Sequence, residues 1–317
     1  MLRLSTNLRF AARHHSTSNA GAEYAFPPYP VSWLKRDALL FAASIGCKVP
    51  SEHHFLYVRA PYPVSFKRDS QDVVDYLASQ QNNITPGVPN FDSRKALDGQ
   101  RLLQVFSPLP TTSKGQNFEI LSKVLGVYDK GMPGSVVETE QLLVNTETNA
   151  VYTRMVSSKF FVGQGGWGGP KGPATPKYPP PEDREDAPDK VSEIQLSNEV
   201  AYLYRLNGDY NPLHATPEPG LKIGLGGTIV HGLYTWNASA VIVLGAFGGS
   251  DPVNMKEFQA RFAAPVKPGV KLAVKMWRLG EVEGGFSEVR FVTEANGEVV
   301  LSNGRALIRC DGETGEE

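Results

Sequence analysis

The sequence predicts an α+β protein of two halves, each with a helix packed on an antiparallel sheet. Residues 30–162 combine an amphipathic helical stretch with several strand-like stretches, and residues 191–310 show that combination again. A segment rich in glycine and proline, residues 163–190, separates them. Helices and sheets each have an apolar side that must be buried against another element, so layers of the two are expected. At 317 residues the chain is long enough for two cores.

The first half begins with a helix and continues with strands. Apolar residues recur at three- and four-residue spacing in VSWLKRDALLFAASIGC, which predicts a helix that ends at Gly46. A turn-rich region around PNFDSRKALDGQRL comes next. Strand-like stretches then follow in RLLQVFSPLP, FEILSKVLGVYDKG and GSVVETEQLLVNTETNAVYTRMVSSKFFV. The last predicts a hairpin, because alternating and β-branched residues flank NTETNA.

The linker contains a glycine pattern that is also found in nucleotide sites. GQGGWG, which starts at Gly163, matches GxGxxG and follows a predicted strand. A dinucleotide site needs a helix directly after the glycines, so that the helix N-terminus can hold the pyrophosphate. Here Pro170, Pro173 and Pro176 follow, and prolines at that spacing prevent such a helix. We therefore expect no nucleotide site.

The second half repeats the order of helix and strands. SNEVAYLYRLNG predicts a short helix capped by Ser197 or Asn198, with Glu199 in its first turn. HGLYTWNASAVIVLGAFGG is apolar on nearly every side, which predicts a helix buried in the core. The strand-like stretches are KEFQARFAAPV, VKLAVKMWRLGEV, FSEVRFVTEAN and EVVLSNGRALIRC, the last two joined at the turn Asn296-Gly297. No internal sequence repeat is obvious.

Composition excludes several classes of protein. The net charge is -1 and no basic stripe with interleaved aromatic residues occurs, so nucleic acid is not an expected partner. The two cysteines, Cys47 and Cys310, give neither a disulfide framework nor a metal-ligand spacing, which points to a reducing compartment without structural zinc. No run of about eighteen apolar residues predicts a membrane span.

Residues 1–22 have the composition of an organelle transit peptide. They carry three arginines among serines and threonines and no acidic residue, and one side of a helix would be apolar. This predicts mitochondrial localisation, with a peroxisomal or cytosolic location as the alternative. The C-terminus is acidic and does not end in a Ser-Lys-Leu tripeptide. The alternative for residues 1–22 is a disordered terminus that is basic by chance.

The chemistry is expected in the sequence GDYNPLH. Asp209 and His214 are five residues apart, about 500° around an α-helix, so a straight helix would not align them. Pro212 disfavours helical geometry at Asn211, and Gly208 is a natural helix terminus. The chain should therefore turn at Asn-Pro and bring carboxylate and imidazole together, where both can hold one water and take its proton. The alternatives are a solvated His214 and a metal site with His231, which lacks a recognised ligand spacing.

Gly232 lies where the buried apolar helix is predicted to begin. Backbone N–H groups are unsatisfied there and the helix dipole is positive. Because glycine has no side chain, a carbonyl oxygen can approach closely and accept those N–H groups as negative charge builds on it. Enolate chemistry on a thioester needs such donors near a base and a water. The structural alternative is that Gly232 allows close helix packing.

These residues resemble a known signature. YRLNGDYNPLHATPEPG and GLGGTIVHGL are similar to YRLSGDxNPLHxDPxxA and GFxxPIxHGL of the MaoC-like (R)-specific enoyl-CoA hydratases, the type-2 hydratases of peroxisomal multifunctional enzymes. In the first half, LDGQR resembles the LHGEQ of that family, VYDKGMPGSVV its DKGKGA segment, and FFVGQGGWGG its F-x-RGxGGFGG. The resemblance covers nearly all of residues 30–310.

The resemblance implies a double hot-dog fold, in which each half has a long central helix wrapped by an antiparallel sheet. The second half would be catalytic and the first would hold the acyl chain. By position, Asp209 and His214 would activate water, Asn211 would help to hold the pair, and the Gly232 N–H would polarise the thioester carbonyl. The expected partner is an acyl-CoA or acyl-carrier-protein thioester, with no cofactor and no metal. The chain would be a monomer with internally paired halves, or a homodimer.

The sequence departs from the family pattern in four places, none of which touches the acid–base pair, and the glycine-rich change at Leu225–Thr228 lies where the pocket wall or acyl entrance is expected. Asp98 stands for a histidine, Thr216 for an aspartate and Tyr234 for a cysteine, and GLGGTI replaces GFxxPI. The expected substrate-binding residues, which include this altered segment, are Leu225, Gly226, Gly227, Thr228 and His231. Two alternatives to hydration of a trans-2-enoyl thioester stay open. One is a biosynthetic dehydratase that acts on acyl-carrier-protein thioesters or an unusual metabolite, and the other is an inactive thioester-binding module.

Overall fold

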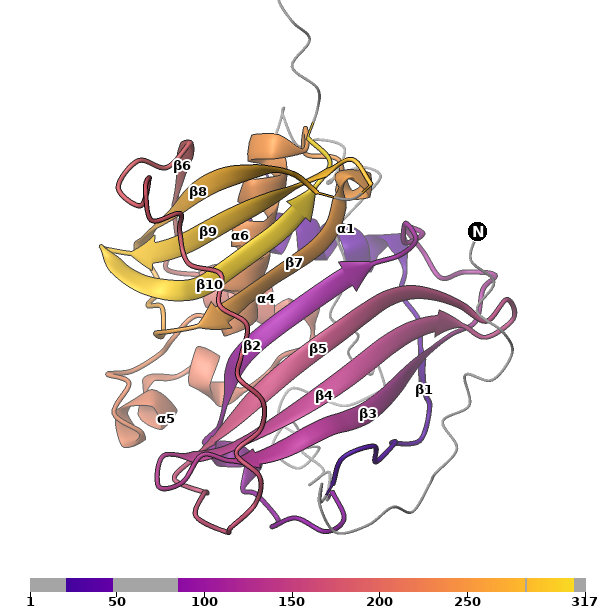
Figure 1. Ribbon diagram of the computed structural model, residues 1–317, viewed down its shortest axis with the longest axis vertical. Coiled ribbons are helices and arrows are strands. Elements are labelled where there is room, and N and C mark those ends of the chain that lie inside the picture. The colour runs from indigo at the N-terminus through magenta and orange to yellow at the C-terminus, as the bar shows by residue number, and fades with distance from the viewer. Residues whose placement is uncertain (1–20, 48–84, 283, 311–317) are drawn as a thin grey trace, which may run out of the picture.

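The protein is built on one antiparallel sheet of ten strands that runs through both halves (Figure 1). The computed structural model describes residues 21–47, 85–282 and 284–310. The strands of the first half are β1 (Tyr29–Val31), β2 (Ala96–Val105), β3 (Phe118–Asp129), β4 (Gly134–Asn145) and β5 (Ala150–Val162). Those of the second half are β6 (Lys190–Gln195), β7 (Met255–Phe262), β8 (Lys271–Val282), β9 (Phe286–Ala295) and β10 (Glu298–Ile308).

The order of the strands shows that the two halves repeat each other in topology. The order is β1-β3-β4-β5-β2-β7-β10-β9-β8-β6, so the first five strands and the last five follow the same path from opposite edges. β2 and β7 pair antiparallel in the middle, for example through Arg101 and Ala260. The halves therefore share one sheet, which is the pairing expected within a double hot-dog chain, although their sequences show no repeat.

The strands predicted from alternation are present, and two short ones are additional. β1 has three residues and β6 has six, and both lie at the edges of the sheet. A segment that short contains too few alternations to be separated from a loop by its sequence. The hairpin between β4 and β5 turns at Thr146–Asn149, inside the NTETNA segment, and the one between β9 and β10 turns at Asn296-Gly297, both as predicted.

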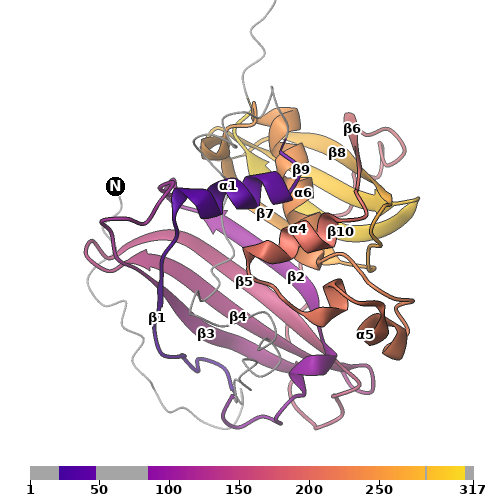
Figure 2. The ribbon, with the colours of Figure 1, turned by 180° about the vertical axis from the view of Figure 1, so that it is seen from behind.

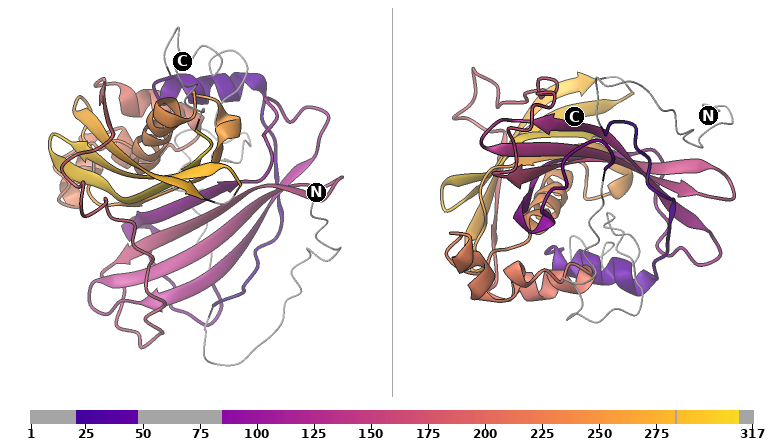
Figure 3. Two further views of the ribbon diagram at one scale, coloured as in Figure 1. Left: turned by 45° about the horizontal axis from the view of Figure 1, so that its top comes forward. Right: turned by 90° about the horizontal axis from the view of Figure 1, so that it is seen from below.

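The long apolar helix is α6 (Gly232–Phe247), with 16 residues. It packs against β7, β8 and β10, and residues on several of its sides are buried, among them Trp236, Val243 and Leu244. Figure 3 shows α6 between the sheet and a further layer of helices. A helix that is apolar all round needs cover on both sides, and these two layers supply it.

That further layer contains α1 (Lys35–Ser44) and α4 (Val200–Tyr204), one helix from each half (Figure 2). α1 ends before Gly46, as predicted, but it packs against α4, and its Phe41 and Ala42 belong to the same core as α6. The long central helix implied for the first half is not found in the described ranges, and residues 48–84 lie outside them. The predicted caps of α4 are wrong, because Glu199 is the N-cap residue and no side chain caps the helix.

The linker follows the outer side of the sheet as extended chain (Figure 1). Residues 163–189, all of which are described, form no helix. The amides of Gly166 and Gly168 donate to the Asp129 carboxylate at 2.7 Å each, and that of Gly131 does so at 2.8 Å. These N–H groups lower the pKa of Asp129. The glycine pattern thus encloses a carboxylate of the protein itself.

Candidate active site

The turn that carries the site begins where a short helical segment ends. α4 continues as a 3₁₀ turn, η3 (Arg205–Asn207), and Gly208 stops it with a φ of 115° that favours glycine. Asn211 is extended, with φ -52° and ψ 122°, and its side-chain oxygen caps the next turn, η4 (Pro212–His214), by accepting the Leu213 N–H at 3.1 Å. The chain therefore reverses at Asn-Pro, as the sequence predicts.

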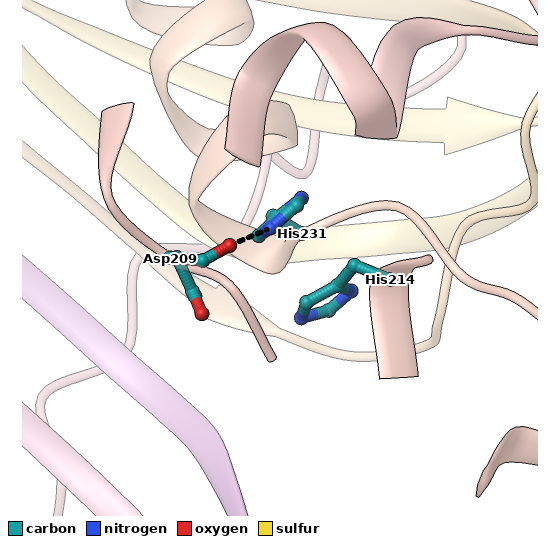
Figure 4. Close-up of side chains that lie close together, drawn as sticks. All are labelled: Asp209, His214 and His231. Carbon is teal, nitrogen blue, oxygen red and sulfur yellow. Dashed lines mark hydrogen bonds between the residues drawn. The ribbon is translucent and has the colours of Figure 1, made fainter. Parts of the chain in front are cut away.

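Asn211 also connects this turn to the carboxylate. Its backbone N–H donates to Oδ1 of Asp209 at 3.2 Å. Ligand atoms of Asp209, His214 and His231 all lie within 4.8 Å of one another. Figure 4 shows one nitrogen of His214 directed at the Asp209 side chain. The structure thus brings Asp209, Asn211 and His214 together from the two sides of one loop.

His214 is held as a neutral imidazole with one free nitrogen. Its side chain is buried, and Nδ1 lies 3.0 Å from the carbonyl oxygen of Ile229. A carbonyl only accepts, so Nδ1 carries the proton of the neutral ring. Burial lowers the pKa of His214 below 6.5, although the Asp209 charge opposes this. Nε2 is therefore a lone-pair acceptor at neutral pH, which is the form that a general base requires.

His231 lies behind this pair. It is 1% exposed, it precedes the first turn of α6, and its Nε2 donates to the backbone oxygen of Asp209 at 3.1 Å. Its ring stacks on His214 at 3.8 Å between centroids, with 26° between the planes. Burial and the neighbouring His214 lower the pKa of His231. Substrate contact by His231 stays a prediction, and in this structure the ring contacts His214 and the Asp209 backbone.

The same contacts bear on the metal alternative. Nε2 of His231 is engaged with the Asp209 carbonyl, and Figure 4 shows its other nitrogen pointing away from Asp209 and His214. Of these three residues, Asp209 and His214 then direct free acceptor atoms at a common space. Two such acceptors suit a shared water better than a metal site with three or four protein ligands.

The start of α6 offers unpaired N–H donors beside this pair. The oxygen of His231 accepts the N–H groups of Tyr234 and Thr235 at 3.0 and 3.4 Å, whereas those of Gly232 and Leu233 have no acceptor in the described ranges. A Cβ added to Gly232 would lie 3.2 Å from the Phe262 ring. These observations are compatible with both roles considered for Gly232, an N–H available to a substrate carbonyl and close packing.

The altered segment Leu225–Thr228 comes directly before Ile229, whose carbonyl oxygen contacts His214. Its carbonyl oxygens surround the Lys267 ammonium, with Gly227 and Thr228 each at 3.4 Å and Leu225 in closer contact. Gly226 and Gly227 have φ values of 67° and 102°, which favour glycine. The next residue, Ile229, accepts from His214. Lys267 thus contacts a loop that is followed by the hydrogen-bond partner of His214, and no sequence pattern indicated this contact.

Two further residues at the site come from the first half. Oδ2 of Asp98 lies 4.0 Å from the position that a Cβ on Gly232 would take, and Arg101 lies 3.6 Å from the Asp98 carboxylate. The departure of LDGQR from the LHGEQ pattern was the only signal for them. On the other side, the ring centroid of buried Tyr204 lies 5.0 Å from that of His231. The Tyr204 hydroxyl accepts a hydrogen bond from the side-chain amide of Asn237.

Comparison with known proteins agrees with this geometry. Residues 181–300 match the model of the MaoC like domain, and residues 32–163 match that of the MFE-2 hydratase 2 N-terminal domain. A protein described as "Probable dehydratase NIT22" of Ajellomyces capsulatus is 47% identical over 310 residues, which cover 92% of this chain and 82% of the relative. The chain belongs to the MaoC-like dehydratase family.

Other similar proteins are less closely related in sequence. A "Probable enoyl-CoA hydratase 2" of Dictyostelium discoideum is 29% identical over 89% of this chain and 92% of its own, and the "Enoyl-CoA hydratase 2, peroxisomal" of Arabidopsis thaliana is 27% identical over 81% and 85%. A MaoC-like dehydratase from Phytophthora capsici superposes with a TM-score of 0.71 at 26% identity, over 90% of this chain and 96% of that one. A double hot-dog protein of Mycobacterium tuberculosis, at 12% identity and TM-score 0.50 over 92% and 96%, supports the fold alone.

Proposed function

We propose that this MaoC-like protein is a hydro-lyase that adds water to a trans-2-enoyl thioester to give the (3R)-hydroxyacyl thioester, or runs the reverse dehydration. One observation carries the proposal. A neutral His214 with a free Nε2 faces the Asp209 carboxylate, next to unpaired N–H groups at the start of α6. The enoyl-CoA hydratase relatives support the same reaction class.

In the hydration direction, the thioester carbonyl oxygen accepts the N–H of Gly232. Asp209 and His214 hold a water, and Nε2 of His214 takes its proton as the oxygen bonds to the β-carbon. The electron pair of the double bond moves toward the carbonyl, and the Gly232 N–H stabilises the resulting enolate oxygen. Return of the proton to the α-carbon completes the addition, so no cofactor is required. Asn211 holds the carboxylate in place, and the loop Leu225–Thr228 forms the wall past which the acyl group enters.

The experiment that tests this proposal compares Asp209→Asn and His214→Ala with the wild type in a crotonyl-CoA hydration assay. Loss of the acceptor pair should lower turnover by roughly 10²–10⁴-fold, the usual contribution of a positioned base. Asp183→Asn is the matched control, because Asp183 is exposed in the linker. Circular dichroism and thermal unfolding establish that the variants fold. Near-normal turnover in either folded variant would refute the assignment.

The carrier of the acyl group and the direction of the reaction, hydration or dehydration, are a second question for the same site. The Ajellomyces capsulatus relative is described as a probable dehydratase. This favours the alternative of a biosynthetic dehydratase that acts on acyl-carrier-protein thioesters or an unusual metabolite. The enoyl-CoA names favour the CoA thioester. Assays with crotonyl and 3-hydroxybutyryl groups on each carrier, with chiral analysis of the products, separate these alternatives. An inactive binding module would need neither the free Nε2 of His214 nor the carboxylate that it faces.

The localisation expected from residues 1–22 is mitochondrial, and none of the relatives named above is described as mitochondrial. The Arabidopsis relative is peroxisomal by name, which supports the peroxisomal alternative. Residues 1–20 lie outside the described ranges, and no described helix has the length and apolar character needed to cross a membrane. Imaging the full chain with and without residues 1–22, against mitochondrial and peroxisomal markers, decides between the two.

A further inference from the structure

The first half contributes a charged pair, Asp98 and Arg101, to the site proposed above. Both residues lie on β2, the strand that pairs with β7 at the junction of the halves. Leu103 on the same strand packs against the core around α6, and side chains two residues apart share a face, so Arg101 is directed to that side. The register of β2 on β5 shifts between Asp98 and Gln100. This bulge at Gly99 brings Asp98 to the side of Arg101, and bulges often redirect a side chain next to an active site.

The position of Asp98 is close to where the thioester carbonyl would bind. Its Oδ2 lies 4.0 Å from the Cβ position of Gly232, and its charge acts on both His214 and Tyr204. The Asp98 side chain is 32% exposed, so it faces open space. A carboxylate here opposes the negative charge that builds on an enolate oxygen. It also becomes desolvated when a plain alkyl chain covers it, which is unfavourable.

Arg101 is largely buried and has donors without partners among the described residues. Its side chain is 11% exposed, its contact with Asp98 is loose at 3.6 Å, and its Nη1 lies 3.6 Å from the sulfur of Met155. Its buried Nε has no hydrogen-bond partner within the described ranges. A guanidinium offers five N–H donors, so this one can still donate to a group that enters the site. The pair therefore offers an acceptor and a donor side by side.

We propose that Asp98 and Arg101 are specificity residues that select enoyl thioesters whose acyl part carries a hydroxyl group near the double bond. A hydroxyl both donates and accepts, so it can satisfy Asp98 and Arg101 at once. This inference rests on the proposed function, since it concerns the substrate of the same site. A site built to bind a substrate hydroxyl discriminates strongly against the analogue that lacks it, because its own polar groups are then left unpaired.

The test measures kcat/KM for two pairs of CoA thioesters that differ by one hydroxyl. The first pair is 4-hydroxy-2-butenoyl-CoA and crotonyl-CoA, and the second is 2-(hydroxymethyl)propenoyl-CoA and 2-methylpropenoyl-CoA. The wild type should favour the hydroxylated member of at least one pair by about tenfold or more. Asp98→Ala should lose that preference, because its kcat/KM should rise for the plain substrate and fall for the hydroxylated one. Asp98→Asn, which keeps an acceptor oxygen, should retain part of it, and Asp183→Ala is the control for loss of an exposed charge.

The possible outcomes separate the two proposals. Equal rates within both pairs for the wild type, or an unchanged preference in Asp98→Ala, would overturn the specificity assignment and leave the hydratase assignment intact. A wild type that acts on none of the four thioesters would overturn the specificity assignment, and it would overturn the hydratase assignment as well if longer 2-enoyl-CoAs and the acyl-carrier-protein thioesters named above also gave no reaction. Arg101→Met gives an independent measurement, since it removes the donor alone and should also reduce the preference.

Discussion

His214 and His231 are stacked imidazoles with different surroundings. Each donates one ring N–H to a backbone carbonyl, that of Ile229 for His214 and that of Asp209 for His231. The second nitrogen of His214 faces the Asp209 carboxylate, whereas that of His231 is buried and has no partner in the part of the chain that the structure describes. This difference supports the proposal that His214 transfers the proton and that His231 helps to position Asp209.

The acid limb of the pH–rate profile should report the pKa of His214, the proposed base. Burial lowers the pKa of His214 below 6.5, with Asp209 and Asp98 opposing the shift and Arg205 adding to it. The neutral imidazole is the active form, so hydration should be independent of pH from neutrality down to about 6.5 and fall as pH drops through the lowered pKa. Asp98→Ala should move the limb to still lower pH, because it removes a negative charge that favours the imidazolium. A limb above pH 6.5 in kcat/KM would contradict the assignment.

At the scale of elements, the first turn of α6 can be tested without disrupting the helix. Proline is well tolerated at the first position of a helix, so Gly232→Pro removes the N–H and keeps the helix start. Gly232→Ala keeps the N–H, and both variants place a Cβ 3.2 Å from Phe262. The difference between them therefore isolates the donor. We expect kcat of the proline variant to be about 10²–10³-fold below that of the alanine variant. Equal kcat values would show that Gly232 acts only in packing.

The loop Leu225–Thr228 depends on one ammonium group for its shape. Lys267→Met removes the cation that its three carbonyl oxygens contact, and the oxygens are then left without that partner. We expect the loop to loosen and the ratio of kcat/KM between short and long 2-enoyl-CoAs to change severalfold, while crotonyl-CoA turnover falls less. Lys222→Met, on an exposed side chain, is the control. An unchanged chain-length profile would place the acyl entrance elsewhere.

The features of the site that could be predicted from the sequence are those with a local signal. The turn at Asn211-Pro212 and the start of α6 at Gly232 follow from residues within one or two turns, and both were predicted correctly. Asp98 reaches the site through a bulge in a strand over a hundred residues away in sequence, and Lys267 through a loop contact. The only signal for Asp98 was the departure of LDGQR from the LHGEQ pattern, and no pattern indicated Lys267. The burial of His231 could not be predicted, because it depends on the whole core.

At the scale of the molecule, the sheet is continuous across the two halves, and a ladder of polar side chains crosses it. Gln104 on β2 donates to Glu257 on β7 at 2.9 Å, and Glu257 pairs with Arg305 on β10. Arg305 also pairs with Glu288 on β9 at 2.8 Å, and Arg154 on β5 donates to Gln104 at 3.1 Å. The order of the strands could not be predicted from the sequence, because it depends on pairing between distant segments. The polar ladder joins neighbouring strands of this order and is one set of contacts that favours it.

Glu257 is the member of the ladder that joins the halves, and it is 8% exposed. Glu257→Ala removes one of the two carboxylates that pair with Arg305 and leaves the Gln104 amide without this acceptor. Removing one partner of a buried charged contact costs more than the contact contributes, so we expect a loss of roughly 2–3 kcal/mol in the free energy of unfolding. Glu298→Ala, an exposed glutamate on β10, should change it by less than about 0.5 kcal/mol. Urea unfolding followed by tryptophan fluorescence measures both variants. Equal stability of the two would mean that apolar packing alone, without the ladder, holds the halves in register.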